Sequence, residues 1–238
     1  MGYGGLSVLA VVPARGGSKA IPGKNLRAVG GVSLVGRAAA LAASIDWIDE
    51  AVISSDDDAI IAEAISHGVD APFVRPPELA TDTATSIDMW RHAWLASERH
   101  YGRSFDVSIL LEPTSPLRTA DDLERTVAAL TAGNHAAAAT VSPTPAHFTP
   151  HKTLTVDAQE RIGFYLQGGQ RFALRQAIPR YFHRNGLCYA VRRKTLVEEG
   201  TILENDCVAV VVERHVVNID DAFELELAEF LLRREGRA

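Results

Sequence analysis

The sequence contains only two cysteines, Cys188 and Cys207, among its 238 residues. Two thiols cannot form a disulfide framework, and by themselves they cannot supply a four-ligand zinc site. Apolar residues flank both cysteines, a context that predicts small buried thiols in strands and favours a reducing compartment. We therefore expect a cytoplasmic protein whose fold is stabilised by packing rather than by disulfides or structural zinc.

Long hydrophobic runs and an excess of basic residues are also missing. No apolar run approaches the roughly 18 residues of a membrane span, and the N-terminus lacks the charged start of a signal peptide. The chain has 24 Lys and Arg against 30 Asp and Glu, a net charge of −6. This balance argues against a protein that covers nucleic acid or an anionic membrane. We expect a soluble globular protein with neither as its partner.

Acidic residues are absent from the first 45 residues, which hold five basic ones. This segment carries +5 while the rest of the chain carries −11. Because the positive charge is confined to this short segment, it predicts a single anion-binding site rather than a surface for a charged polymer.

Short β-rich apolar runs alternate with longer helical patterns along the chain. We expect strands at residues 7–12, 51–54, 71–74, 106–111, 136–141, 187–191 and 207–212. We expect helices at 32–45, 86–101 and 221–234, one capped by Ser55 or Asp56, and one opened by Thr119. This alternation predicts an α/β protein with a mostly parallel sheet flanked by helices, and a ligand crevice at the carboxyl ends of its strands.

The alternation breaks between about Pro143 and Asn185, a stretch with six of the sixteen aromatic residues. A loop of this length inside a compact domain is unusual unless it has a function, and its aromatic content favours burial. Two interpretations remain open from the residues alone. The stretch is either an extra β-hairpin on the same core or an interface with a second subunit.

A glycine-rich, basic segment follows the first predicted strand, and it reads Val12-Pro-Ala-Arg-Gly-Gly-Ser-Lys-Ala-Ile-Pro-Gly-Lys-Asn25. Its glycines let the backbone approach a ligand closely, and Arg15, Lys19 and Lys24 supply the cations that a triphosphate requires. It is neither a Walker A sequence nor a GxGxxG motif, so ATPase and dehydrogenase interpretations lose support. The alternative is a glycine-rich surface turn with solvated Lys and Arg.

This segment resembles the phosphate loop of the acylneuraminate (CMP-sialic acid) cytidylyltransferase family. The resemblance continues in family order through motifs that span nearly the whole chain: Ser54-Ser55-Asp56-Asp57, Arg75-Pro76 to Ser86, Leu110-Leu-Glu-Pro-Thr-Ser-Pro-Leu-Arg118, Arg175, Asn185-Gly186-x-x-Tyr189 and Asn218-Ile219-Asp220. It implies a Rossmann-like fold of the nucleotidyltransferase type. It also implies a homodimer, so we expect one domain over residues 1–238 with a dimerisation segment inserted at about 145–185.

The resemblance implies a role for individual residues. The residues that would bind CTP are Arg15, Gly17, Ser18, Lys24 and Asn25 at the phosphates and ribose, and Arg75, Ala84 and Ser86 at the base. The residues that would face the acidic sugar are Glu112, Arg175, Asn185 and Tyr189, with Lys152 reaching across from the partner subunit. Asp82 is expected to brace its loop. His183 stands where the family often has an arginine.

Two departures from the family concern the metal side of the expected site. Glu112 replaces the usual glutamine, and Asn218 replaces the first aspartate of an Asp-x-Asp metal site, which leaves Asp220. The resemblance implies Mg²⁺ held by Asp220, with Asn218 or Glu112 as further candidates. Because one carboxylate is lost and one is gained at strand ends that border the same expected crevice, we expect the two changes to be coupled.

The resemblance thus predicts a CMP-sialate synthase-type enzyme with Arg15, Lys24 and Asp220 as its catalytic residues. It would transfer CMP from CTP to a nine-carbon 2-keto sugar acid, sialic acid or a related nonulosonate, and release pyrophosphate. The alternatives are a relative that uses another nonulosonate or nucleotide, and a nucleotide-sugar binding protein with weakened turnover.

Overall fold

The computed structural model describes residues 2–171, 178–204 and 206–237. These residues divide into two compact units. The large unit consists of Met1–Thr140, Asn185–Val210 and His215–Ala238, and the small unit consists of Val141–Arg184 and Val211–Arg214. Among the described residues, no helix combines the length and the apolar character needed to cross a membrane.

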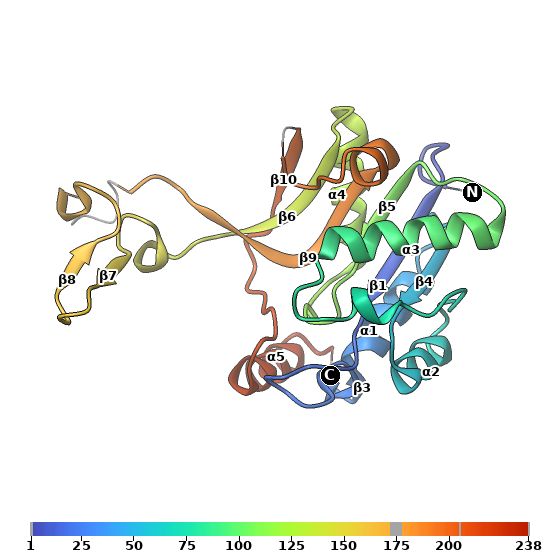
Figure 1. Ribbon diagram of the computed structural model, residues 1–238, viewed down its shortest axis with the longest axis horizontal. Helices are drawn as coiled ribbons and strands as arrows, with labels where there is room; N and C mark the ends of the chain where they lie inside the picture. Colours follow the sequence, from blue (N-terminus) through green and yellow to red (C-terminus); the bar gives the residue numbers. More distant parts are fainter. Residues whose placement is uncertain (1, 172–177, 205, 238) are drawn as a thin grey trace. The chain divides into compact units, whose positions relative to one another are not determined.

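A six-stranded sheet with the order β10-β6-β9-β5-β1-β4 forms the centre of the fold (Figure 1). Its strands are β1 (Val8–Pro13), β4 (Glu50–Ser54), β5 (Val107–Leu110), β6 (Ala137–Pro143), β9 (Phe182–Arg192) and β10 (Cys207–Val211). Strand β1 pairs in parallel with β4 and with β5, whereas β5 and β9 are antiparallel. The predicted α/β fold with a mostly parallel sheet is confirmed.

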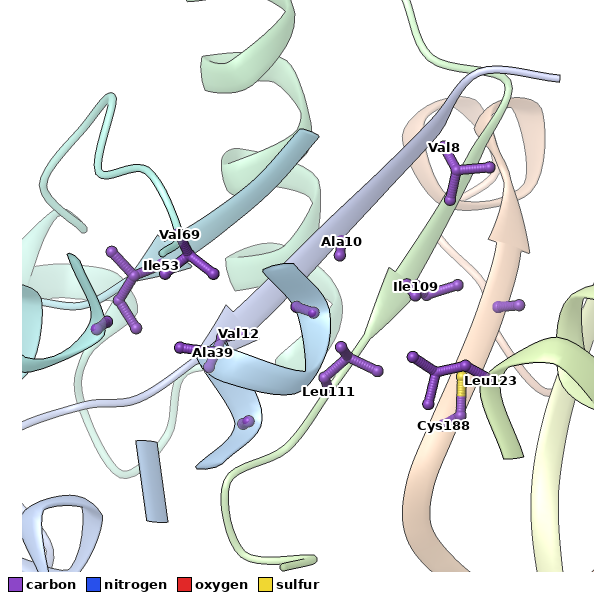
Figure 2. Close-up of a cluster of buried hydrophobic side chains, with 14 of the residues drawn as sticks. Val8, Ala10, Val12, Ala39, Ile53, Val69, Ile109, Leu111, Leu123 and Cys188 are labelled. Carbon is purple, nitrogen blue, oxygen red and sulfur yellow. The ribbon is translucent and has the colours of Figure 1, made fainter. Parts of the chain in front are cut away.

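Helices cover both faces of this sheet. One face packs against α1 (Leu34–Ala43), α2 (Asp58–Ser66) and α4 (Ala120–Ala132). The other packs against α3 (Ser86–Tyr101) and the short helix η6 (Lys194–Glu198). Strand β1 supplies Val8, Ala10 and Val12 to the first face and alternate residues to the second. Figure 2 shows these three side chains among those of neighbouring elements, including Ile109 and Leu111.

The helix ends follow local sequence signals. Thr85 caps α3 by accepting a hydrogen bond from the Asp88 amide, and Gly102 ends that helix with φ 64°. Thr119 and Asp122 form a capping box at the start of α4. Asp221 does the same with Glu224 at the start of α5 (Ala222–Arg234). The predicted helices at 86–101 and 221–234, and the one opened by Thr119, are confirmed.

Three boundary predictions were wrong. Residues 71–74, all of which the structure describes, form no strand, and only Asp70 makes a bridge to Val52. Prolines at 72, 76 and 77 cannot donate to a ladder, which explains why the apolar run does not extend this bridge. The cap of α2 is Asp57 rather than Ser55 or Asp56. Helix α1 begins at Leu34 with Ser33 as its cap, because residues 32–33 pair as a short strand.

The remaining elements are short. They are β2 (Ala28–Val29), β3 (Val32–Ser33), β7 (Leu154–Val156), β8 (Ile162–Phe164), η1 (Lys24–Leu26), η2 (Pro77–Leu79), η3 (Ala146–Phe148) and η4 (Gly169–Arg171). Strands β7 and β8 form a separate antiparallel pair in the small unit, and every residue in them is exposed. A hairpin is therefore present between Pro143 and Asn185, but its own chain does not bury its side chains as the aromatic content led us to expect.

Candidate active site

A cleft of about 220 Å³ opens at the carboxyl ends of β1 and β5. Residues from three parts of the chain line it: Pro13, Arg15, Ser18, Lys24 and Asn25 after β1; Arg75, Leu79, Thr81, Ala84, Thr85, Ser86 and Met89; and Leu110, Glu112, Pro113 and Thr114 after β5. The predicted nucleotide-binding residues thus lie around one cavity, with Gly17 as the exception among the described residues. Gly17 lies in the same loop, between two other expected members of the site.

The loop after β1 is held by contacts with its own residues and with the segment after β4. The side-chain amide of Asn25, which is 8% exposed, donates to the Arg15 carbonyl at 3.0 Å. The Gly16 amide donates to a carboxylate oxygen of Asp56 at 3.1 Å. A Cβ at Gly16 would lie 2.7 Å from a carboxylate oxygen of Asp57, so only glycine allows this approach. The Ser54–Asp57 motif therefore supports the loop.

Asp82 binds two cations of the loop. Its carboxylate pairs with the Arg15 guanidinium at 2.9 Å and also with the Lys19 ammonium. The hydrogen bond from Lys19, followed by that from Arg15, lowers the pKa of the Asp82 carboxyl below its usual value. Asp82 therefore holds two residues of the loop after β1, whereas the prediction was that it braces its own loop. Its carboxylate occupies N–H donors that a phosphate would use.

Arg75 is buried, with 5% of its surface exposed, rather than solvated as an isolated Arg-Pro-Pro sequence would be. Its Nε donates to the Ser54 hydroxyl at 3.1 Å, and its Nη2 donates to the Ser54 carbonyl at 2.5 Å. Burial lowers the pKa of the guanidinium to about 10, and the nearby charge of Asp56 opposes this shift. The group is thus oriented at the cleft wall by β4.

Lys24 joins the loop to the segment that precedes α5. Its ammonium donates to the Ile219 carbonyl at 2.9 Å and lies 3.5 Å from the Asp220 carboxylate. Buried Ile219 anchors this segment, because its amide donates to the Thr114 carbonyl at 2.8 Å. Two of the three predicted catalytic residues, Lys24 and Asp220, are therefore in contact. Arg15 lines the same cleft as Lys24.

The sequence over residues 9–216 matches the family model described as Cytidylyltransferase. The chain belongs to this family. Post-translational flagellin modification protein B of Campylobacter coli is 26% identical over 96% of this chain and 96% of its own length. CMP-N,N'-diacetyllegionaminic acid synthase of Legionella pneumophila is 36% identical over 51% of this chain and 52% of its own.

A solved cytidylyltransferase structure has the same fold. It is that of a CMP:2-keto-3-deoxy-manno-octonic acid synthetase complexed with CTP, with a TM-score of 0.71 and 18% identity. The superposition covers 96% of this chain and 99% of that one. At this level of identity the likeness concerns the fold alone.

Around Gly186, the structure brings together the two positions at which this cytidylyltransferase departs from the expected motif. Gly186 has φ 69°, and a Cβ there would lie 2.8 Å from a carboxylate oxygen of Glu112 and 3.7 Å from Cγ of Asn218. Glu112 and Asn218 therefore border the same glycine. The Asn218 side-chain oxygen is buried, and it accepts no hydrogen bond from the described residues.

Asp220 and Asn218 carry oxygen atoms of the types that could hold a divalent cation. Within the described ranges, no three His, Cys, Asp or Glu side chains converge as a complete metal site. The Asp220 side chain is 77% exposed, and Asn218 two residues earlier carries the unpaired buried oxygen. Carboxylate and amide oxygens are ligand types that Mg²⁺ accepts, and Mg²⁺ usually completes its shell with water and phosphate oxygens.

The structure brings together only some of the expected sugar-binding residues. Asn185, 3% exposed, follows the small unit and accepts a hydrogen bond from Ser115 at its carbonyl. Tyr189 on β9 is paired in register with Leu110, which lines the cleft. Arg175 lies outside the described residues. Lys152 belongs to the small unit, as does His183, whose ring nitrogen lies 3.1 Å from the Thr144 hydroxyl.

Sequence reasoning assigned no role to Arg118, which organises the cleft wall. This buried guanidinium donates to the carbonyls of Glu112 at 2.7 Å and Gly186 at 3.0 Å, and also to the Leu187 carbonyl. Burial lowers its pKa to about 10. Sequence reasoning also did not identify Asp56 as the acceptor of a hydrogen bond from the loop after β1. Its place two residues after β4, at the same edge of the sheet as Gly16, was the available signal.

Proposed function

We propose that this cytidylyltransferase activates a nonulosonate, a nine-carbon 2-keto sugar acid such as sialic acid or a relative of it, with CTP. The observation that carries the proposal is the single cleft that combines the phosphate-loop cations, a buried arginine and the Glu112 segment. Similarity to the Legionella pneumophila relative supports the substrate class, since that protein is a CMP-N,N'-diacetyllegionaminic acid synthase.

In this proposal the nucleotide occupies the cleft from β1 to α3. Arg15, Ser18, Lys24 and Asn25 bind the phosphates and ribose, with the Gly17 backbone close to them. Arg75 uses Nε and Nη2 on Ser54, which leaves other N–H groups of its guanidinium for the cytosine carbonyl. The Ala84 backbone and the Ser86 hydroxyl would complete the selection of the base.

The reaction is an in-line displacement at the α-phosphorus of CTP. The C2 hydroxyl oxygen of the sugar forms a bond to this phosphorus, the bond to the β-phosphate oxygen breaks, and pyrophosphate leaves. The hydroxyl proton is released to solvent. Arg15 and Lys24 stabilise the negative charge that builds on the phosphate oxygens. Asp220 keeps Lys24 oriented through the 3.5 Å contact between their charged groups.

Mg²⁺ is the proposed cofactor. Asp220 would hold it, with Asn218 or Glu112 as the second protein ligand, and the ion would neutralise phosphate charge. The sugar would contact Glu112, Asn185, Tyr189 and Arg175. Lys152 would act from a second copy of the chain.

We further propose that the small unit pairs with a second copy. Its exposed apolar side chains support this, among them Ile162 at 71% and Val156 at 66% exposure. Light scattering should find a dimer whose dissociation constant rises at least about 100-fold in Ile162→Asp, since a buried unpaired charge opposes association. Gln159→Asp, on the nearby turn, is the matched control. Equal dissociation of both variants would contradict the pairing.

One assay tests the main proposal. Pyrophosphate release is measured with CTP, Mg²⁺ and a panel of sialic, legionaminic, pseudaminic and deaminated nonulosonic acids. Release with at least one acid is expected, and the best acid identifies the substrate. CTP binding without release on any acid would instead favour a nucleotide-sugar binding protein. Faster release with UTP or GTP would contradict the cytidylyl assignment.

A further inference from the structure

A second cavity, of about 250 Å³, shares Pro113 with the cleft but has a different character. Three arginines from distant parts of the chain line it: Arg37 on α1, Arg118 after β5, and Arg237 after α5. Ser115 supplies a hydroxyl, and the other described lining residues are apolar, so no carboxylate borders the cavity among them. Three arginines that line a space of this size produce a positive potential in it.

Backbone carbonyls hold these guanidinium groups in place. Arg37 donates through Nη2 to the Val29 carbonyl at 2.6 Å, and Arg237 donates to the carbonyls of Leu117 at 3.1 Å and Arg118 at 2.6 Å. Carbonyl oxygens fix the orientation of a guanidinium without cancelling its charge. Because these side chains are already ordered, little conformational entropy would be lost when a ligand binds to their remaining N–H groups.

Carboxylates outside the cavity compensate these charges incompletely. Glu235 pairs with Arg237 at 3.0 Å, and Glu229 attracts Arg37 while also pairing with Arg233. Burial and, after it, repulsion by Arg237 lower the pKa of the Arg37 guanidinium. The Arg37 Nε is buried and finds no hydrogen-bond acceptor among the described residues.

The charge of Arg118 is also compensated only in part, since burial still lowers the pKa of its guanidinium. It is 4% exposed, and its hydrogen bonds within the described chain go to the carbonyls of Glu112, Gly186 and Leu187. The carboxylates of Glu112 and Asp122 attract this cation, and an anion in the cavity would lower the cost of its burial further. The cavity beside it is large enough to admit one.

We propose that this cavity is a second binding site, for a small oxyanion of the phosphate type. Arg37 and Arg237 contact the anion, and the charge of Arg118 adds to the attraction. Because Arg118 also binds the carbonyls of Glu112 and Gly186, an anion here stabilises the wall that the two cavities share. The source is free phosphate or, if the proposed function holds, the pyrophosphate that the reaction releases.

Calorimetric titration of the full chain with inorganic phosphate, and separately with pyrophosphate, tests the site. The Lys24→Met background weakens anion binding in the cleft. One phosphate should bind per chain, with a dissociation constant on the order of 0.1–1 mM for so small a ligand. Arg37→Gln and Arg237→Gln should each weaken binding at least about 10-fold. Arg99→Gln, an exposed position on α3 with the same charge change, should not.

Melting temperatures provide a second readout and a check on folding. Phosphate at about ten times its dissociation constant should raise the Tm by about 2–4 °C, and the same phosphate concentration should raise it by less than about 1 °C in Arg237→Gln. Pyrophosphate binding at least about 10-fold tighter than phosphate identifies the product as the ligand, and equal binding identifies free phosphate. Absence of binding, or binding that persists in both arginine variants, overturns the site whatever the pyrophosphate-release assay shows.

Discussion

The two units of the molecule differ in how far they bury their apolar side chains. In the large unit, residues 8–12 of β1 are fully buried, and so are Ile109, Trp90 and Trp94 from neighbouring elements. In the small unit, all residues of β7 and β8 are exposed, and Phe148 is 70% exposed. The large unit thus contains a core of its own. The small unit has a hairpin that buries little apolar surface within the chain.

This difference in burial indicates that the two units have different roles. Burial of apolar side chains is the main favourable term in folding, so the large unit has the means to hold a cleft in fixed geometry. A two-stranded hairpin alone is only marginally stable in water, so the small unit gains most from covering its exposed face. The comparison predicts that cleft substitutions change catalysis and that hairpin substitutions change association.

Among the substitutions considered, Lys24→Met in the cleft should have the largest effect, and the effect should be on catalysis. The substitution removes the ammonium that contacts Ile219 and Asp220, which is one of the two side-chain cations proposed to stabilise the reacting phosphates. We expect kcat/KM for CTP to fall by about 10³-fold or more, in the range seen when one electrostatic stabiliser is lost. Pyrophosphate release gives the rate, and light scattering should show unchanged association. A loss below 10-fold would remove Lys24 from the catalytic residues.

A pair of isoleucine truncations sharpens the comparison of stability. Ile109→Ala in the buried sheet should lower the free energy of unfolding by about 2–5 kcal/mol, because it leaves a cavity. Ile162→Ala on the exposed hairpin should cost less than about 0.5 kcal/mol at protein concentrations below the dimer dissociation constant. Urea denaturation measures both. Similar losses would show that the hairpin is buried even in a single chain.

Substitutions at Glu112 and Asn218, the two residues that border Gly186, should have a smaller effect on activity, and a second substitution should reverse it. Glu112→Gln removes a carboxylate beside Asn218 and should lower Mg²⁺-dependent kcat/KM by about 10-fold, since a metal site would lose part of its negative charge. The double variant Glu112→Gln, Asn218→Asp should recover to within about 3-fold of the original rate. Titration of activity with Mg²⁺ separates the two. Equal losses in the single and double variants would show that the positions are independent.

Asp82→Asn should have the smallest effect. Its carboxylate competes with the triphosphate for Arg15 and Lys19, so the amide should lower the KM for CTP by about 3-fold and leave kcat unchanged. Thr83→Ala, in the same loop, is the control. A rise in KM would mean that Asp82 positions the two cations for the nucleotide.

The sequence was sufficient for features that local signals determine. Thr119 opens a helix as predicted, and the basic loop after β1 lines the cleft as expected. Features that depend on contacts between distant residues were not accessible. The Asp56 contact with Gly16 spans 40 positions, and the Arg118 contact with Gly186 spans 68. Residues 71–74 do not form the predicted strand because Pro72 within the run, and Pro76 and Pro77 after it, cannot donate hydrogen bonds to a neighbouring strand.

The central claim is that the cleft of the large unit transfers a cytidylyl group to a nonulosonic acid. Its most direct test is the initial rate of pyrophosphate release with CTP, UTP or GTP at a fixed concentration of the best acid, with mass spectrometry of the product. We predict a CMP-sugar and a rate with CTP at least about 100-fold above those with UTP and GTP. An equal or faster rate with UTP or GTP, or a product without the sugar, would contradict the account.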